Sequence, residues 1–135
     1  MRHFSALVLL LIVAATSTAQ DQAAEAKKIP VIDAGLGNCS VEFTVRDSAQ
    51  KPVYAAKIHV RVLYGFMGLH KLDLEAATNV DGKLRFTGLS AKARQPLEFH
   101  ASKDDLQGMG VVDLSKECNS EHTIVLQKAV GDSPN

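Results

Sequence analysis

The stretch that decides the fold runs from residue 77 to residue 89 and reads Ala77-Thr78-Asn79-Val80-Asp81-Gly82-Lys83-Leu84-Arg85-Phe86-Thr87-Gly88-Leu89. Asp81-Gly82 is a dipeptide that tolerates the positive φ of a type I′ turn, whose twist matches the strands on either side. After the turn, polar and apolar residues alternate from Lys83 to Thr87, as expected for a strand with one buried face. The stretch therefore predicts a β-hairpin.

Together with Lys51-Pro52-Val53-Tyr54-Ala55-Ala56-Lys57-Ile58-His59-Val60 upstream, this stretch resembles the carboxypeptidase regulatory-like domains of the transthyretin-like (prealbumin-like) β-sandwich group. In those domains a turn and a proline precede an alternating strand, and the pattern T-[ND]-x-[DE]-G-x-[FY]-x-F-x-x-L follows. The resemblance covers roughly Cys39 to Gln127. It implies a non-catalytic module, because in larger enzymes of this kind the domain accompanies a separate catalytic unit.

Short alternating segments separated by turn signals recur along residues 39–128, and no long helical period interrupts them. Six or seven such strands predict an all-β fold, an antiparallel Ig-like or prealbumin-like β-sandwich. The expected strands are 39–46, 54–64, 72–79, 83–89, 96–103, 111–114 and 122–127, with a turn at 104–110 and a loop at 115–121.

The two ends of the chain differ from this central part. Arg2, the apolar run from Phe4 to Ala15 and the small residues Ser17-Thr18-Ala19 predict a signal peptide over residues 1–19. The run is shorter than the roughly 20 apolar residues of a membrane span. We therefore expect an exported protein, periplasmic or extracellular, with no membrane span after signal cleavage. Residues 20–38 are expected to form a flexible leader with a possible edge strand at Ile29 to Ile32, and residues 129–135 a disordered tail.

Cys39 and Cys118 are the two cysteines of the chain. In an exported protein, two cysteines indicate one disulfide. A redox or metal pair would use the short C-x-x-C spacing, which these residues do not have. Closing a loop of about 80 residues stabilises a fold by roughly 4 kcal/mol in the loop-entropy model.

Charge and motifs exclude several classes of function. The chain has 15 Lys+Arg and 15 Asp+Glu, so removing Arg2 with the signal peptide leaves 14 against 15, a net charge of −1. Nucleic-acid binding needs a clustered basic excess, and the charges here are interspersed. There is no G-x-S-x-G nucleophile elbow. We expect a protein that is not an enzyme and has no cofactor.

Two alternatives remain open. His59 and His100 lie on the polar faces of their predicted strands, and a shared sheet could bring them together in a small exported metal-binding protein or enzyme. Alternatively, the chain is a structural subunit that assembles by strand addition through Ile29 to Ile32.

The candidate contact surface centres on Gly65-Phe66-Met67-Gly68, which sets two apolar residues between glycines. This loop either folds over the end of the core or presents an exposed apolar patch. The sequence favours a secreted or periplasmic non-catalytic binding module for a protein or carbohydrate partner. Its predicted contact residues are Phe66, Met67 and His70, then Lys92 and Arg94 of a basic loop, and the cationic strand face of Lys57, His59 and Arg61.

Overall fold

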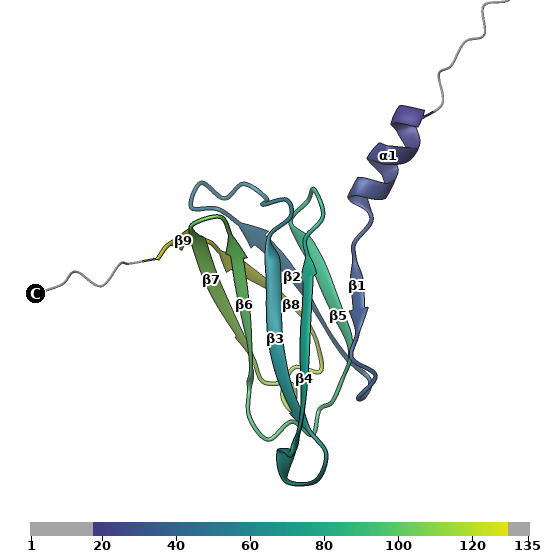
Figure 1. Cartoon of the computed structure of the whole chain (residues 1–135), viewed down its shortest axis with the longest axis vertical. Helices are drawn as coiled ribbons and strands as arrows, with labels where there is room; N and C mark the ends of the chain where they lie inside the picture. The colour runs from purple at the N-terminus through teal and green to yellow at the C-terminus, as the bar shows by residue number, and fades with distance from the viewer. Residues whose placement is uncertain (1–17, 130–135) are drawn as a thin grey trace, which may run out of the picture.

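The computed structural model describes residues 18–129, and within them the chain forms nine strands in two facing sheets (Figure 1). Most of the predicted signal peptide and of the predicted tail lies outside the described residues, at 1–17 and 130–135. In chain order the elements are α1 (Thr18–Lys27), β1 (Val31–Asp33), β2 (Cys39–Arg46), β3 (Lys57–Tyr64), the short 3-10 helix η1 (Phe66–Gly68), β4 (His70–Ala77), β5 (Lys83–Leu89), β6 (Leu97–Lys103), β7 (Leu106–Val112), β8 (Asn119–Val125) and β9 (Gln127–Lys128).

The strands form an all-β sandwich, as predicted. One sheet has the order β1-β5-β2-β8 and the other the order β4-β3-β6-β7-β9. The five-stranded sheet is fully antiparallel, as predicted. The four-stranded sheet is mixed, because β2 pairs with β5 in antiparallel, whereas β1 pairs with β5 and β2 with β8 in parallel. The two strands beyond the predicted seven are the short β1 and β9.

The predicted hairpin is wrong, because β4 and β5 belong to different sheets. The chain crosses between the sheets at Thr78, whose hydroxyl donates to the carbonyl of Val53 at 2.7 Å. In the turn, Gly82 N–H donates to the carbonyl of Asn79 at 3.0 Å, and Gly82 has a φ of +72°. Val80 and Asp81 have negative φ, which makes this a type I turn followed by glycine rather than type I′.

The predicted turn at 104–110 is also wrong. The turn consists of Asp104 and Asp105, and β7 begins at Leu106. Gly108 and Gly110 lie within this strand because neighbouring elements approach it closely. A Cβ at Gly108 would come within 2.7 Å of Ile124 Cγ2, and one at Gly110 within 3.2 Å of the Phe43 ring.

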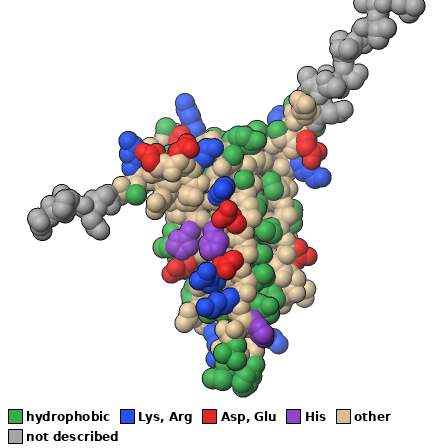
Figure 2. All heavy atoms as spheres, in the orientation of Figure 1, with side chains coloured by type: hydrophobic (Ala, Val, Ile, Leu, Met, Phe, Trp, Pro, Cys, Tyr) green, Lys and Arg blue, Asp and Glu red, His purple; other side chains and the backbone are tan. Residues whose placement is uncertain are grey.

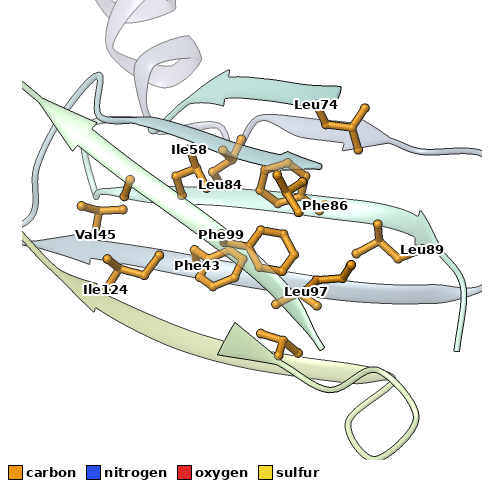
Figure 3. Packing of buried hydrophobic residues seen from close by; sticks show 14 of the residues in the cluster. Phe43, Val45, Ile58, Leu74, Leu84, Phe86, Leu89, Leu97, Phe99 and Ile124 are labelled. Atoms are coloured by element: carbon orange, nitrogen blue, oxygen red, sulfur yellow. The ribbon is translucent and has the colours of Figure 1, made fainter. Parts of the chain in front are cut away.

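The core lies between the two sheets and is built from the predicted inward faces of the strands (Figure 3). At its centre, the ring centroid of Phe43 lies 4.5 Å from that of Phe99, and Phe86 lies 5.2 Å from Phe99. The predicted disulfide between Cys39 and Cys118 is present, and it ties the start of β2 to the loop before β8. Cys39 is buried on the core side, as the alternation of β2 predicts.

The leader is more ordered than predicted, since α1 covers residues 20–27 of it, and the possible edge strand is present from Val31 to Asp33 rather than from Ile29 to Ile32. Pairing between β1 and β5 places Ile32 opposite Phe86 at the edge of the four-stranded sheet. Sequence periodicity does not reveal α1, because this helix has no sustained apolar stripe. Within the described part of the chain, no helix has the length and apolar character needed to cross a membrane.

Candidate functional site

An open groove lies at the end of the molecule where β3 finishes and β6 begins. Its walls are the outward side of these two strands, the end of η1 and the loop of residues 90–96, and its volume is about 1060 Å³. The groove exists because β3 and β6 pair as antiparallel neighbours, which brings the loop before β6 beside the end of β3.

The groove brings together five of the eight predicted contact residues: His59, Arg61, Met67, Lys92 and Arg94. The other three, Phe66, His70 and Lys57, are outside it. The sequence interpretation missed Tyr64 and Glu98, which line the groove. The pairing of β3 with β6 could have indicated Glu98. Phe99 is the partner of Val60, so in this antiparallel pair the preceding residue, Glu98, lies on the same face of the sheet as Arg61.

The predicted cationic face of β3 is wrong, because β4 supplies matching carboxylates. Asp73 Oδ1 lies 2.8 Å from Arg61 Nε and 3.1 Å from His59 Nε2, and Lys57 Nζ lies 3.9 Å from Glu75 Oε1. The hydrogen bond from Arg61 lowers the pKa of Asp73, although partial desolvation opposes this shift. The face is therefore close to neutral along most of β3.

His59 and His100 are direct cross-strand partners, as the metal-site alternative requires. Each imidazole nevertheless faces its own carboxylate: His59 faces Asp73, and His100 Nε2 lies 3.5 Å from Glu98 Oε2. In Figure 2, two histidines lie side by side on this face with acidic side chains above and below them. Among residues 18–129, no three or more His, Cys, Asp or Glu side chains are placed to hold one metal ion.

Unmatched positive charge at this end comes from the loop of residues 90–96. Lys92 and Arg94 are exposed, and neither has a carboxylate within ion-pair distance in the described part of the chain. The loop begins with a turn in which Ala93 N–H donates to the carbonyl of Ser90 at 3.3 Å. The groove thus pairs a cationic wall with the single acidic residue Glu98.

The β3–β4 connection projects beyond the groove as an apolar tip formed by Phe66, Met67 and Leu69. Their exposed fractions are 81%, 63% and 73%. Figure 2 shows hydrophobic side chains gathered at this lower end of the molecule. The interpretation of this loop as a cover over the core is therefore wrong, and the exposure expected of a contact patch is present.

The base of the tip is held in a defined conformation. The Tyr64 and His70 rings stack with centroids 5.2 Å apart and planes at 28°. Gly65 has a φ of +79°, and a Cβ there would come within 2.6 Å of the His70 ring. A glycine is required at this position because a side chain would collide with that stack.

The strand-addition alternative involves the segment that contains β1. Val31 to Asp33 is already paired with β5 of its own chain. β1 is the edge strand of this sheet, so its outer side has no strand neighbour among the described residues, and a strand of another copy could pair there while β1 stays on β5. The strand-addition alternative stays a prediction.

The chain is similar to known proteins in structure only. No protein-family model matches the chain, and neither does any curated protein. Solved structures that match include 3-chlorocatechol 1,2-dioxygenase from Rhodococcus opacus 1CP, with 10% identity, a TM-score of 0.45, and coverage of 75% of this chain and 64% of that one. The dioxygenase domain of a dioxygenase–carbohydrate-binding fusion from Streptomyces sp. SirexAA-E matches with 12% identity, a TM-score of 0.47 and coverage of 76% and 92%. A shaft pilin from Lactobacillus rhamnosus GG matches with 13% identity, a TM-score of 0.43 and coverage of 72% and 49%.

These low identities and TM-scores say nothing about the activity of this chain. The resemblance to carboxypeptidase regulatory-like domains stays a prediction.

Proposed function

We propose that the protein is an exported, non-catalytic binding module of the carboxypeptidase regulatory-like type, and that its groove binds an anionic protein or carbohydrate partner. The observation that supports this most directly is the grouping of Lys92 and Arg94, exposed and without carboxylate partners in residues 18–129, on one wall of the groove. A cleft lined by one sign of charge attracts ligands of the opposite sign and accelerates their association.

The groove also offers apolar contact area beside its charges. Leu63, Tyr64 and Pro96 line it, and Tyr64 presents both an aromatic face and a hydroxyl. Binding sites for organic ligands combine such apolar walls with a few polar groups that fix orientation. Carboxylate, sulfate or phosphate groups on a peptide or glycan would suit Lys92 and Arg94.

A non-catalytic role agrees with the electrostatics of the strand face beside the groove, where Arg61 lines the groove and its partner Asp73 does not. Catalytic acids and bases acquire shifted pKa values chiefly through burial or convergent charges in a cleft. Here the pKa of Asp73 is lowered and that of Arg61 is raised mainly by the exposed hydrogen bond between them. That pattern is typical of a surface ion pair.

Export is supported by the signal-peptide pattern and by the disulfide. The Cys39–Cys118 bond joins segments separated by 79 residues. Disulfides of this structural kind persist in oxidising compartments and are rare in the reducing cytosol.

The test is a binding screen of the mature chain against acidic glycans and acidic peptides, in parallel with neutral ones. We expect retention of anionic ligands that weakens with added salt, and a loss of at least about tenfold in Lys92→Glu/Arg94→Glu. The matched control is Lys51→Glu/Lys128→Glu, which makes the same charge change at exposed positions outside the groove. Equal losses in both variants, or no preference for anionic ligands, would contradict the proposal.

The cross-strand pair of His59 and His100 favours a second candidate, a metal-binding protein. Two imidazoles can bind Zn²⁺ or Cu²⁺, with the remaining ligands supplied by water or a partner. Metal titration of the mature chain and of His59→Gln and His100→Gln tests this candidate. Loss of metal affinity in each of the two variants would support this candidate. Unchanged metal affinity in both variants would exclude it.

A further inference from the structure

We infer that the apolar tip of Phe66, Met67 and Leu69 enters the surface of an anionic lipid membrane. Lys71, Lys92 and Arg94 would then lie among the lipid headgroups. This inference goes beyond the proposed groove ligand, because Phe66 and Leu69 are outside the groove.

The shape of the tip is the first argument. It is the outer end of a hairpin, and the rest of the described chain leaves its three side chains mostly exposed (Figure 2). Exposed apolar groups gathered in one place mark an interaction site, because their contact with water is unfavourable. A protein partner could bury a projecting tip only in a matching pocket, whereas fluid lipid closes around it.

The backbone of the tip is the second argument. Gly68 N–H donates to the carbonyl of Gly65 at 3.2 Å, and Leu69 N–H donates to the carbonyl of Phe66 at 3.3 Å. Apolar lipid offers no hydrogen bonds, so backbone groups that enter it must be satisfied internally. These two bonds lower the cost of placing the turn at the boundary between headgroups and acyl chains.

Met67 provides a third argument through its backbone conformation. Its φ is 54° and its ψ is 20°, a left-handed conformation that a large side chain rarely adopts. Glycine or asparagine would occupy this position with less strain. Strained residues of this kind concentrate at functional positions, and here the conformation directs a large apolar side chain outward.

Behind the apolar tip, an aromatic residue is followed by basic residues, which is the order found at a membrane–water interface. Tyr64, stacked on His70, lies at the base of the hairpin, and tyrosine is enriched at membrane–water boundaries. The next charged residue is the exposed Lys71, and the nearby loop carries Lys92 and Arg94.

Charge complementarity selects an anionic surface. The segments of residues 63–72 and 90–96 contain no Asp or Glu. The next acidic residue along β4, Asp73, is already paired with Arg61. Basic residues near a membrane are attracted to its anionic lipids, and this attraction weakens as salt is added.

The test uses a property of the sequence: the chain contains no tryptophan. Phe66→Trp therefore places the one tryptophan of the chain at the tip, where its emission can be excited apart from that of the two tyrosines. We expect its emission to shift to the blue with mixed phosphatidylcholine–phosphatidylglycerol vesicles, and much less with phosphatidylcholine alone. Met109→Trp is the control, since Met109 is a half-exposed residue of β7 and should give no shift.

Vesicle co-sedimentation measures how much the apolar tip and the basic residues each contribute to membrane binding. Replacing Phe66, Met67 and Leu69 with Ser should lower partitioning at least about tenfold, and Lys92→Glu/Arg94→Glu should have a similar effect on anionic vesicles. Met109→Ser/Val111→Ser removes exposed apolar side chains elsewhere and should change nothing. Thermal unfolding of each variant verifies that it is folded.

Two results would overturn the inference. The first is no partitioning of the unmodified mature chain into either kind of vesicle. The second is a blue shift of Phe66→Trp that follows protein concentration without lipid, since this would identify the tip as a contact between copies of the chain. Neither result bears on the groove ligand, whose binding should survive Phe66→Ser/Leu69→Ser because neither residue lines the groove.

Discussion

The side-chain amide of Asn79 donates a hydrogen bond to the carbonyl oxygen of Lys27, 2.9 Å away, and so joins the end of α1 to the turn before β5. The same nitrogen lies 3.3 Å from the carbonyl oxygen of Lys28, while Asn79 Oδ1 accepts from the N–H groups of Asp81 and Lys83. Asn79 is only 4% exposed. One buried side chain thus holds the leader, the turn and the start of β5 in a single arrangement.

Asn79→Ala should therefore destabilise the protein by about 1–3 kcal/mol, because it removes the hydrogen bonds of a buried side chain to four backbone groups. Asn79→Asp separates the two roles, since a carboxylate can still accept from the turn but cannot donate to Lys27. Chemical denaturation measures the loss of stability, and hydrogen exchange should show α1 loosened in both variants and the turn loosened only in Asn79→Ala. Unchanged exchange in α1 would contradict this role.

Gly82→Val should destabilise the protein by roughly 1–3 kcal/mol more than Gly35→Val. Both glycines have positive φ, +72° and +65°, so both substitutions strain the backbone. A Cβ at Gly82 would also collide with the carbonyl oxygen of Val45, whereas nothing lies within 4 Å of a Cβ at Gly35. Equal denaturation midpoints for the two variants would mean that the contact with β2 is unimportant.

The inward faces of the strands could be predicted from the sequence because alternation depends only on neighbouring residues. Val41, Phe43, Ile58 and Phe86 are buried as predicted. The sheet to which each strand belongs could not be predicted in this way. A chain that crosses the sandwich after Ala77 buries the same alternate residues as a hairpin would, so the pattern does not distinguish the two topologies.

The candidate site was predictable only in part for a similar reason. Its residues belong to β3, β6 and the loop before β6, so the groove depends on pairing between distant segments. The charge of the β3 face depends on β4, which places Asp73 opposite Arg61. Composition alone identifies Lys92 and Arg94 as basic, but it does not reveal which cations lack carboxylate partners.

The pKa of Asp73 should rise toward its ordinary value in Arg61→Gln, because the hydrogen bond from Arg61 is the largest cause of its lowered pKa. A carboxyl whose folded-state pKa is lowered stabilises the fold above its unfolded-state pKa and loses this contribution as the pH falls through the folded value. The pair is exposed, so its effect on stability should be small. NMR titration of the carboxyl measures the midpoint directly, with Lys128→Gln as a control that should leave it unchanged.

Replacing Cys39 and Cys118 with Ala should lower stability by at most about 4 kcal/mol, the loop-entropy value for a closure of this length. Intact-mass measurement should show the wild-type protein gaining the mass of two hydrogen atoms on reduction, two protons with the two electrons that the reducing agent supplies. A reducing agent should lower the melting temperature of the wild type and leave that of the double variant unchanged. Two free thiols in protein purified under oxidising conditions would contradict the bond.

Phe66→Ser/Met67→Ser should leave thermal stability nearly unchanged, because both side chains are exposed in the folded protein and contribute little to its core. The matched core control is Phe99→Ala, which removes a fully buried ring in contact with Phe43 and should cost about 3–5 kcal/mol. Calorimetry of the three proteins gives the comparison. A large drop in melting temperature for the tip variant would show that the β3–β4 connection packs on the core in solution. In that case Phe66 and Met67 would no longer be free to contact a membrane, and the exposed charges of the loop of residues 90–96 would be the remaining basis for a contact surface at this end of the sandwich.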